Sequence, residues 1–103
     1  MKMLYVICKN KAEAIKISKY LLEKKLCACT NFFEINSMYK WNSKIIKDSE
    51  TLLLIKTTKK LYKTATEQIM SIHSYKIPCI LEINIKANSE YKMWADSVCF
   101  RQI

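Results

Sequence analysis

Glycine is absent from the 103-residue sequence, and proline, arginine and histidine occur once each, as Pro78, Arg101 and His73. Without glycine, the chain cannot form the phosphate-binding loops of P-loop or Rossmann proteins. Backbone positions with positive φ must instead be filled by Asn, Asp or Ser. A single arginine leaves few bidentate contacts for base recognition. Nucleic-acid binding is therefore not expected, although the net charge is +9.

Long hydrophobic runs are also missing. No segment reaches the roughly 18 consecutive apolar residues of a membrane-spanning helix, so no membrane association is expected. The apolar stretch 3–8 is too short for the core of a signal peptide and is followed by Lys9. Five cysteines, an odd number, without a signal peptide indicate reduced thiols and a cytoplasmic protein. Half of the residues are hydrophobic, which predicts a single domain, 1–103, that folds without disulfides or a metal.

The most regular part of the sequence is residues 31–58, which predict a long β-hairpin. Apolar and aromatic residues alternate with polar ones from position 33 to 41, a period of two that is typical of a half-buried strand. Asn42 and Ser43 supply the turn, and a second strand over 44–57 contains the apolar run 52–55. Because typical strands have about 5–6 residues, we expect the hairpin to extend beyond its own domain and to contact another copy.

Helical spacing and capping residues predict the remaining elements. Residues 3–8 form a buried strand, and Asn10 caps a helix in which Glu13 completes a capping box and which ends near Lys24 and Lys25. The predicted buried face of this helix is Ala14, Ile15, Ser18, Leu21 and Leu22.

A second helix is predicted to be capped by Thr57 or Thr58 and to end near His73. A strand over 79–85 and a last helix capped by Asn88 or Ser89 follow. The core positions predicted in the two helices are Leu61, Ala65, Ile69 and Ile72 in the first, and Tyr91, Trp94, Ala95 and Val98 in the second.

The resulting order predicts an α+β fold, a ferredoxin-like βαββαβ sandwich with an extra C-terminal helix. Both helices of that fold cover the same face of the sheet. We therefore expect its other face to be closed by subunit association.

Catalytic patterns are weak. A nucleophilic Cys8 or Cys79 beside His73 would lack an orienting third residue, and Asp48 and Glu50 are two positions apart on a strand that looks exposed. No enzymatic activity is expected.

The sequence gives more support to metal binding than to catalysis. His73 and Cys79 would suit Cu(I) or Zn(II), whereas a backbone-bonded histidine and a buried thiol are the structural alternative, which composition favours. The pair Cys27 and Cys29 is a weak metal signal and fits packing at a strand entry.

Four segments resemble the CutA family of divalent-cation tolerance proteins. Residues 37–58, S-M-Y-K-W-N-S-K-I-I-K-D-S-E-T-L-L-L-I-K-T-T, resemble its S-x-Y-x-W-x-G-K-I-x-x-x-x-E-x-x-L-x-x-K-T pattern, with Ser43 in place of the glycine. Residues 73–80, H-S-Y-K-I-P-C-I, are similar to H-P-Y-x-x-P-E-I. Residues 26–30 and 91–94 match two shorter family patterns. The four segments occur in the family's order over nearly the whole chain.

The resemblance implies a trimer of the PII-like superfamily, held together by the long hairpin strands, and a role in tolerance of copper or another divalent metal. Carried over position by position, it implies Cys8 and His73 as metal ligands. Cys79 stands at the family's acidic position, where a thiol would favour Cu(I). We leave open the roles of Cys27, Cys29 and Cys99.

A second function compatible with the same fold is that of a PII-like regulatory or scaffolding trimer. Its clefts between subunits would bind a small anionic ligand or an unidentified protein partner. The residues expected to line these clefts are Tyr39, Trp41, Lys44, Glu50, Lys56 and Tyr75.

Overall fold

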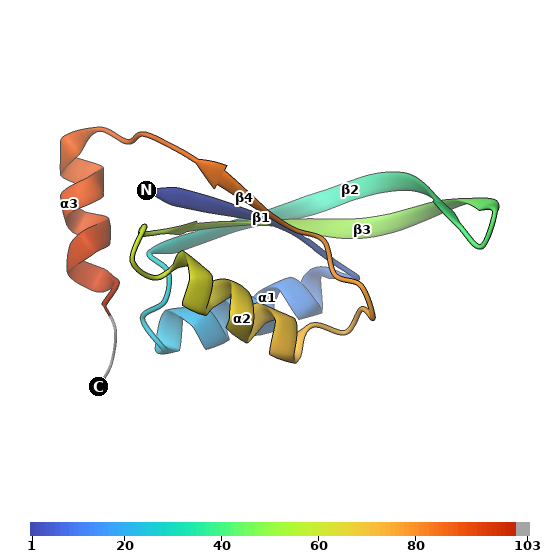
Figure 1. The fold of residues 1–103 in the computed structure, drawn as a ribbon, viewed down its shortest axis with the longest axis horizontal. Helices are drawn as coiled ribbons and strands as arrows, with labels where there is room; N and C mark the ends of the chain where they lie inside the picture. The colour runs from blue at the N-terminus through green and yellow to red at the C-terminus, as the bar shows by residue number, and fades with distance from the viewer. Residues whose placement is uncertain (101–103) are drawn as a thin grey trace.

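The computed structural model describes residues 1–100 as one four-stranded antiparallel sheet and three helices (Figure 1). Along the sheet the strands lie in the order β2-β3-β1-β4. This is the ferredoxin-like βαββαβ topology with an added C-terminal helix, as the sequence predicts. In chain order the elements are β1 (Lys2–Cys8), α1 (Lys11–Glu23), β2 (Cys29–Trp41), β3 (Lys44–Thr57), α2 (Tyr62–Ile72), β4 (Ile80–Asn84) and α3 (Ser89–Val98).

The hairpin of β2 and β3 is the longest feature of the molecule. The two strands pair from Cys29 with Lys56 to Trp41 with Lys44, while β1 pairs only with positions 51–57 of β3. Among the strands of residues 1–100, the first half of β3 therefore pairs with β2 alone, and the tip projects beyond the helices (Figure 1). Asn42 and Ser43 have φ values of 51° and 64°, which is the two-residue turn that matches strand twist. Ser43 thus adopts the conformation for which the family pattern has glycine.

The two faces of the sheet have different surroundings. Helices α1 and α2 lie on the same face (Figure 1). On that covered face Leu4, Val6 and Cys8 of β1 are fully buried, opposite Ile55, Leu53 and Thr51 of β3. The opposite face, called here the open face, has no helix across it among residues 1–100. Its apolar members include Phe33, Trp41, Leu81 and Ile83, all of them exposed.

Helix α1 begins as predicted, but its buried face is different. The Asn10 side chain accepts a hydrogen bond from the Glu13 N–H at 2.9 Å, which confirms the cap. The prediction that Ile15 and Leu22 are buried is wrong, since both are exposed. Positions 14, 17, 18 and 21 follow the 3.6-residue period more closely, and Ile17 is fully buried. Lys25, with φ of 59°, then fills the left-handed position that follows many helices, so the expectation that only Asn, Asp or Ser would adopt positive φ is wrong here.

The start of α2 also differs from the prediction. Neither Thr57 nor Thr58 caps it. The Thr57 hydroxyl donates to the Leu26 carbonyl at 2.7 Å, and Leu61 occupies the N-cap position without a side-chain hydrogen bond. The core positions Leu61, Ala65 and Ile69 are confirmed as buried, and Ile72 is half-buried.

The last strand and helix bury less than expected. Strand β4 is shorter than predicted, and in α3 only Ala95 is buried. Tyr91 is half-buried with its ring 5.5 Å from that of Trp94, which is exposed. Asn88 occupies the N-cap position, as one of the two predicted caps, but its side chain makes no cap hydrogen bond.

Candidate functional site

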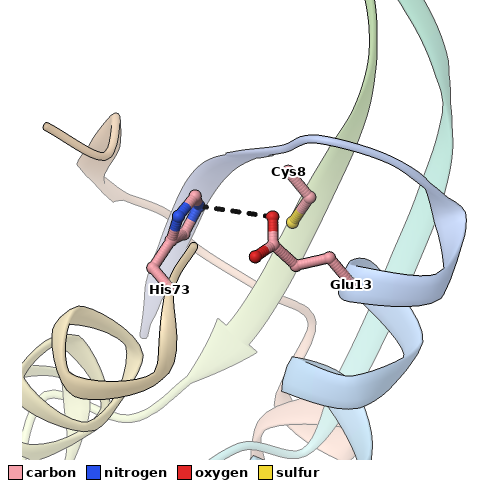
Figure 2. Close-up of side chains that lie close together, drawn as sticks. All are labelled: Cys8, Glu13 and His73. Atoms are coloured by element: carbon pink, nitrogen blue, oxygen red, sulfur yellow. Dashed lines mark ion pairs between the residues drawn. The ribbon is translucent and has the colours of Figure 1, made fainter. Parts of the chain in front are cut away.

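Three side chains with metal-binding chemistry meet where β1 ends. Cys8, Glu13 and His73 each offer one donor atom, and these atoms lie within 4.8 Å of one another. Figure 2 shows the three side chains pointing toward a common point between β1, α1 and the end of α2. The Glu13 side chain is 5% exposed and that of His73 is fully buried. The sequence predicted Cys8 and His73, but it assigned Glu13 only a capping role.

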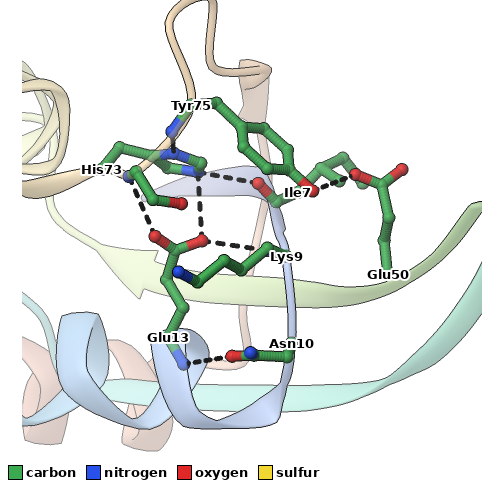
Figure 3. A network of polar contacts seen from close by, with 8 residues as sticks. Ile7, Lys9, Asn10, Glu13, Glu50, His73 and Tyr75 are labelled. Carbon is green, nitrogen blue, oxygen red and sulfur yellow. Dashed lines mark hydrogen bonds and ion pairs between the residues drawn. The ribbon is translucent and has the colours of Figure 1, made fainter.

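Glu13 joins two loops that are far apart in the sequence. Its Oε1 accepts from the Lys9 N–H and its Oε2 from the Ser74 N–H, both at 2.9 Å. The carboxylate thus bridges the turn after β1 and the loop after α2 (Figure 3). A standard capping box would have bonded the Asn10 N–H, so that part of the prediction is wrong. Glu13 instead reaches one residue further back and fixes the geometry of the site.

His73 is held by backbone groups through both ring nitrogens. The Tyr75 N–H donates to Nδ1 at 3.0 Å, so Nδ1 carries no proton. Nε2 lies 2.8 Å from the Ile7 carbonyl oxygen, to which its N–H donates, and 4.0 Å from Glu13 Oε1 (Figure 3). The hydrogen bonds therefore select one tautomer and one ring orientation.

The electrostatics of the cluster are set by burial and by backbone donors. Burial raises the pKa of the Cys8 thiol to about 12, and the nearby Glu13 and Glu50 carboxylates add to the shift. Burial also acts to raise the pKa of Glu13, but hydrogen bonds from Ser74 and Lys9 outweigh it and hold that pKa below its usual value. A protonated thiol therefore lies beside an ionised carboxylate.

The donor set is suited to a soft or borderline metal ion. A thiolate and an imidazole are ligands for Cu(I) and Zn(II), and a carboxylate oxygen is a common third ligand for Zn(II). Hard ions such as Mg²⁺ would require more oxygen ligands than the cluster offers. Coordination would have to displace the thiol proton and one hydrogen bond of the imidazole. The residues therefore fit such an ion, and its binding would release the Cys8 thiol proton.

Cys79 is not part of this cluster. The Ile7 N–H donates to the Cys79 carbonyl at 3.2 Å, which continues the β1–β4 register and places Cys79 opposite Ile7. Because side chains alternate along a strand, Cys79 belongs to the open face with Leu81, whereas Cys8 belongs to the covered face. Burial raises the pKa of the Cys79 thiol, with a smaller contribution from Glu50.

The predicted cleft residues lie in three places in one chain. The Tyr75 hydroxyl donates to Glu50 Oε2 at 2.5 Å, and Glu50 is buried although it belongs to the open face. Burial raises the pKa of Tyr75, as does its bond to Glu50. Tyr75 thus connects the two faces, with its N–H on His73 and its hydroxyl on Glu50 (Figure 3).

The other cleft residues lie away from that pair. Tyr39 donates to Asp48 at 3.2 Å, and Trp41 pairs with Lys44 beside the hairpin turn. Lys56 lies near the opposite end of β3, with its Nζ 5.8 Å from the centre of the Tyr91 ring.

The remaining cysteines lie near the entry of β2 and the end of α3. Burial raises the pKa of the Cys27 thiol to about 12 and that of Cys99 to about 11. Cys29 is half-buried, with its Sγ 3.8 Å from the Thr30 carbonyl oxygen. All five cysteines are free thiols. The surroundings of Cys27 and Cys99 are those of packing residues.

Comparison with known proteins agrees with the fold and with the order of its elements. The sequence model described as "CutA1 divalent ion tolerance protein" matches residues 2–98. The chain belongs to the CutA1 family. Among curated relatives, the divalent-cation tolerance protein CutA of Archaeoglobus fulgidus is 36% identical over 94 residues, covering 90% of this chain and 92% of that one.

Solved structures of the CutA1 family superimpose closely on this chain. A point mutant of CutA1 from Pyrococcus horikoshii has a TM-score of 0.95 at 30% identity, and the match covers 98% of this chain and 100% of that one. The Archaeoglobus fulgidus CutA structure, described as a periplasmic divalent cation tolerance protein, has a TM-score of 0.91 at 35% identity, with 95% and 98% coverage. No helix within residues 1–100 is both long and apolar enough to cross a bilayer.

Proposed function

We propose that this protein is a non-catalytic metal-tolerance protein that binds a soft metal ion, Cu(I) in the first place, through Cys8 and His73. The observation that carries the proposal is the convergence of the Cys8, Glu13 and His73 donor atoms within 4.8 Å. The relative in Archaeoglobus fulgidus is named for divalent-cation tolerance, which supports a role in metal handling. Copper or another divalent metal is thus the expected ligand, and folding does not require it.

The proposed role of each residue follows from its chemistry. Cys8 supplies a thiolate after losing its proton, and His73 supplies a ring nitrogen after exchanging one backbone hydrogen bond for the metal. Glu13 is ionised beside them and offsets the positive charge of the ion. Cys79 lies on the open face, so in this proposal it could only hold a metal shared between subunits.

A copper titration with matched variants tests the site. The reduced protein is titrated anaerobically with Cu(I) in competition with a chromogenic chelator, beside Cys8→Ser, His73→Gln and the control Cys79→Ser. We expect one Cu(I) per chain in the parent and in the control, and loss of tight binding in the other two. Because binding releases the thiol proton, affinity should rise about tenfold per pH unit between pH 6 and 8. Equal binding by all four proteins would contradict the proposal, and thermal melts verify that each is folded.

We further propose that the protomers assemble as a homotrimer through the open face and the hairpin, each protomer being one domain. The support is the row of exposed apolar side chains on that face, including Phe33, Trp41 and Leu81. Light scattering at micromolar concentration should give three times the chain mass of 12.2 kDa. A mass of one chain would exclude the assembly.

A second function, a PII-like regulatory trimer, is favoured by one observation. Glu50 is a buried carboxylate on the open face, paired with Tyr75, where a cleft between subunits would form. An anionic metabolite or a partner protein bound there should raise the melting temperature. A thermal-shift screen of organic anions, repeated with Tyr75→Phe, separates this function from metal binding.

The cytoplasm is the location that we propose for the protein. The support is the set of five free thiols, which are typical of a reducing compartment. The Archaeoglobus fulgidus relative is described as periplasmic, so cell fractionation is the direct test.

A further inference from the structure

We propose that a groove between the start of α2 and α3 binds a small phosphorylated molecule with an apolar body. The groove encloses about 870 Å³, within the range of small-molecule sites. Its lining includes residues of α3, the helix that Figure 1 shows at the end of the sheet away from the hairpin tip, and it shares no residue with the Cys8–Glu13–His73 cluster. The residues that line it are Met1, Thr58, Lys59, Lys60, Leu61, Lys92, Asp96, Cys99 and Phe100.

The charge of the groove favours an anion. Three of the lining residues are lysines and only one is acidic. Lys92 Nζ is already paired with Asp96 at 2.9 Å. Within residues 1–100, Lys59 and Lys60 have no carboxylate at ion-pair distance. Both lysines directly precede α2, so their charges lie at the positive end of the helix dipole.

One uncharged group at this helix end, the Thr58 hydroxyl, can donate to a phosphate oxygen. Helix α2 has no side-chain cap and no acidic residue in its first turn, and the Leu61 and Tyr62 N–H groups already donate to the Thr58 carbonyl. Thr58 lines the groove and is only 8% exposed, yet its hydroxyl has no hydrogen-bond partner among the described residues. Because its oxygen is not one of the sealed, unpaired side-chain atoms of residues 1–100, the hydroxyl is free to donate to a ligand in the groove.

The floor of the groove indicates what the rest of the ligand is. Met1, Leu61 and Cys99 are buried, and the Phe100 side chain is half exposed at 48%. An aromatic or aliphatic body would cover this apolar surface while its phosphate contacts Lys59, Lys60 and Thr58. Inorganic phosphate would leave that surface in water, so an organic phosphate should bind more tightly.

Three probes test the assignment by calorimetry and ¹⁵N NMR: 1-naphthyl phosphate, inorganic phosphate and 1-naphthol. The full chain should bind 1-naphthyl phosphate at least about tenfold more tightly than either other probe. Only that probe contacts both the lysines with its phosphate and the apolar floor with its rings. Amide shifts should centre on Thr58, Leu61 and Phe100. Equal affinity for inorganic phosphate, or shifts centred on the open face, would overturn the assignment.

Charge-reversal variants separate this groove from general attraction to a basic protein. The double variant Lys59→Glu with Lys60→Glu should weaken 1-naphthyl phosphate about tenfold or more. The control, Lys16→Glu with Lys19→Glu on the exposed side of α1, makes the same change in net charge and should alter affinity less than twofold. Phe100→Ala should weaken 1-naphthyl phosphate but leave inorganic phosphate unchanged. Similar losses in the control and the double variant would refute the site.

Discussion

The two faces of the sheet differ in how far the protomer buries their apolar side chains. On the covered face Leu4, Val6 and Leu53 are fully buried by α1 and α2. On the open face Phe33 is 53% exposed and Leu81 is 51% exposed, although they come from the same sheet. The protomer therefore forms a complete core on one side and leaves comparable apolar surface on the other.

The polar groups differ between the faces in the same way. On the covered side, Glu13 and His73 are each held by two backbone hydrogen bonds within the protomer. On the open side, the carboxylate of the buried Glu50 has one hydrogen-bond partner within residues 1–100, the Tyr75 hydroxyl. On the covered face, folding of one protomer buries the apolar side chains and pairs the polar groups. On the open face, we expect subunit assembly to do both.

The largest expected effect is on the covered face. Leu53→Ala removes a fully buried side chain and should lower the free energy of unfolding by about 2–5 kcal/mol. Because the loss lies within one protomer's core, urea unfolding should show it at every protein concentration. A loss below about 1 kcal/mol would mean that this face is less tightly packed than the burial indicates.

The next largest effect is expected on the open face, where a substitution should weaken assembly and not the fold of the protomer. Leu81→Lys places a charge in the proposed interface and should lower the stability of the assembly by about 1–3 kcal/mol per protomer, while a single chain tolerates it. Light scattering at micromolar concentration should show a smaller mass. The control Leu22→Lys, at an exposed site on α1, should leave the mass unchanged. A Leu81→Lys protein of unchanged mass would contradict assembly through this face.

A smaller, pH-dependent effect should follow from Glu13→Gln. The amide loses charge-assisted bonds to the Lys9 and Ser74 N–H groups, so unfolding free energy should fall by about 1–2 kcal/mol at pH 7. The folded state lowers the pKa of Glu13. Its contribution is therefore present above the unfolded value near 4.5 and is lost as the pH falls through the folded value.

The pH series supplies the decisive check on Glu13. The stability difference between parent and variant should be constant above about pH 6 and should close as the pH drops below 4.5. Glu23→Gln, an exposed change on the same helix, should match the parent throughout. If the difference in unfolding free energy between the parent and Glu13→Gln widened in acid, the assigned direction of the pKa shift would be wrong.

Much of the fold is predictable because strands carry strong local signals. The alternation after Phe33, the Asn42 and Ser43 turn and the Asn10 cap each identify an element from a few neighbouring residues. Helix phase is harder, since Ile15 and Leu22 are as apolar as Ile17 and only packing against the sheet selects between them. Local sequence signals therefore predict where the helices and strands lie, whereas packing against the sheet determines which face of a helix is buried.

The candidate site is predictable only in part. Cys8 and His73 could be paired from the family pattern, but Glu13 carried a capping signal that concealed its reach to Lys9 and Ser74. The face of Cys79 was available from alternation with Leu81, a signal that the sequence interpretation did not use. The two bonds of His73 come from backbone groups of Ile7 and Tyr75, for which no side chain gives a signal.

X-ray absorption at the copper edge tests the central claim most directly, because it identifies the atoms bound to the metal. For the protein loaded with one Cu(I) per chain, coordination by Cys8 and His73 predicts one sulfur together with at least one nitrogen or oxygen neighbour. In Cys8→Ser that sulfur signal should disappear, and in Cys79→Ser it should persist. A spectrum with sulfur ligands alone, unchanged by Cys8→Ser, would contradict the account.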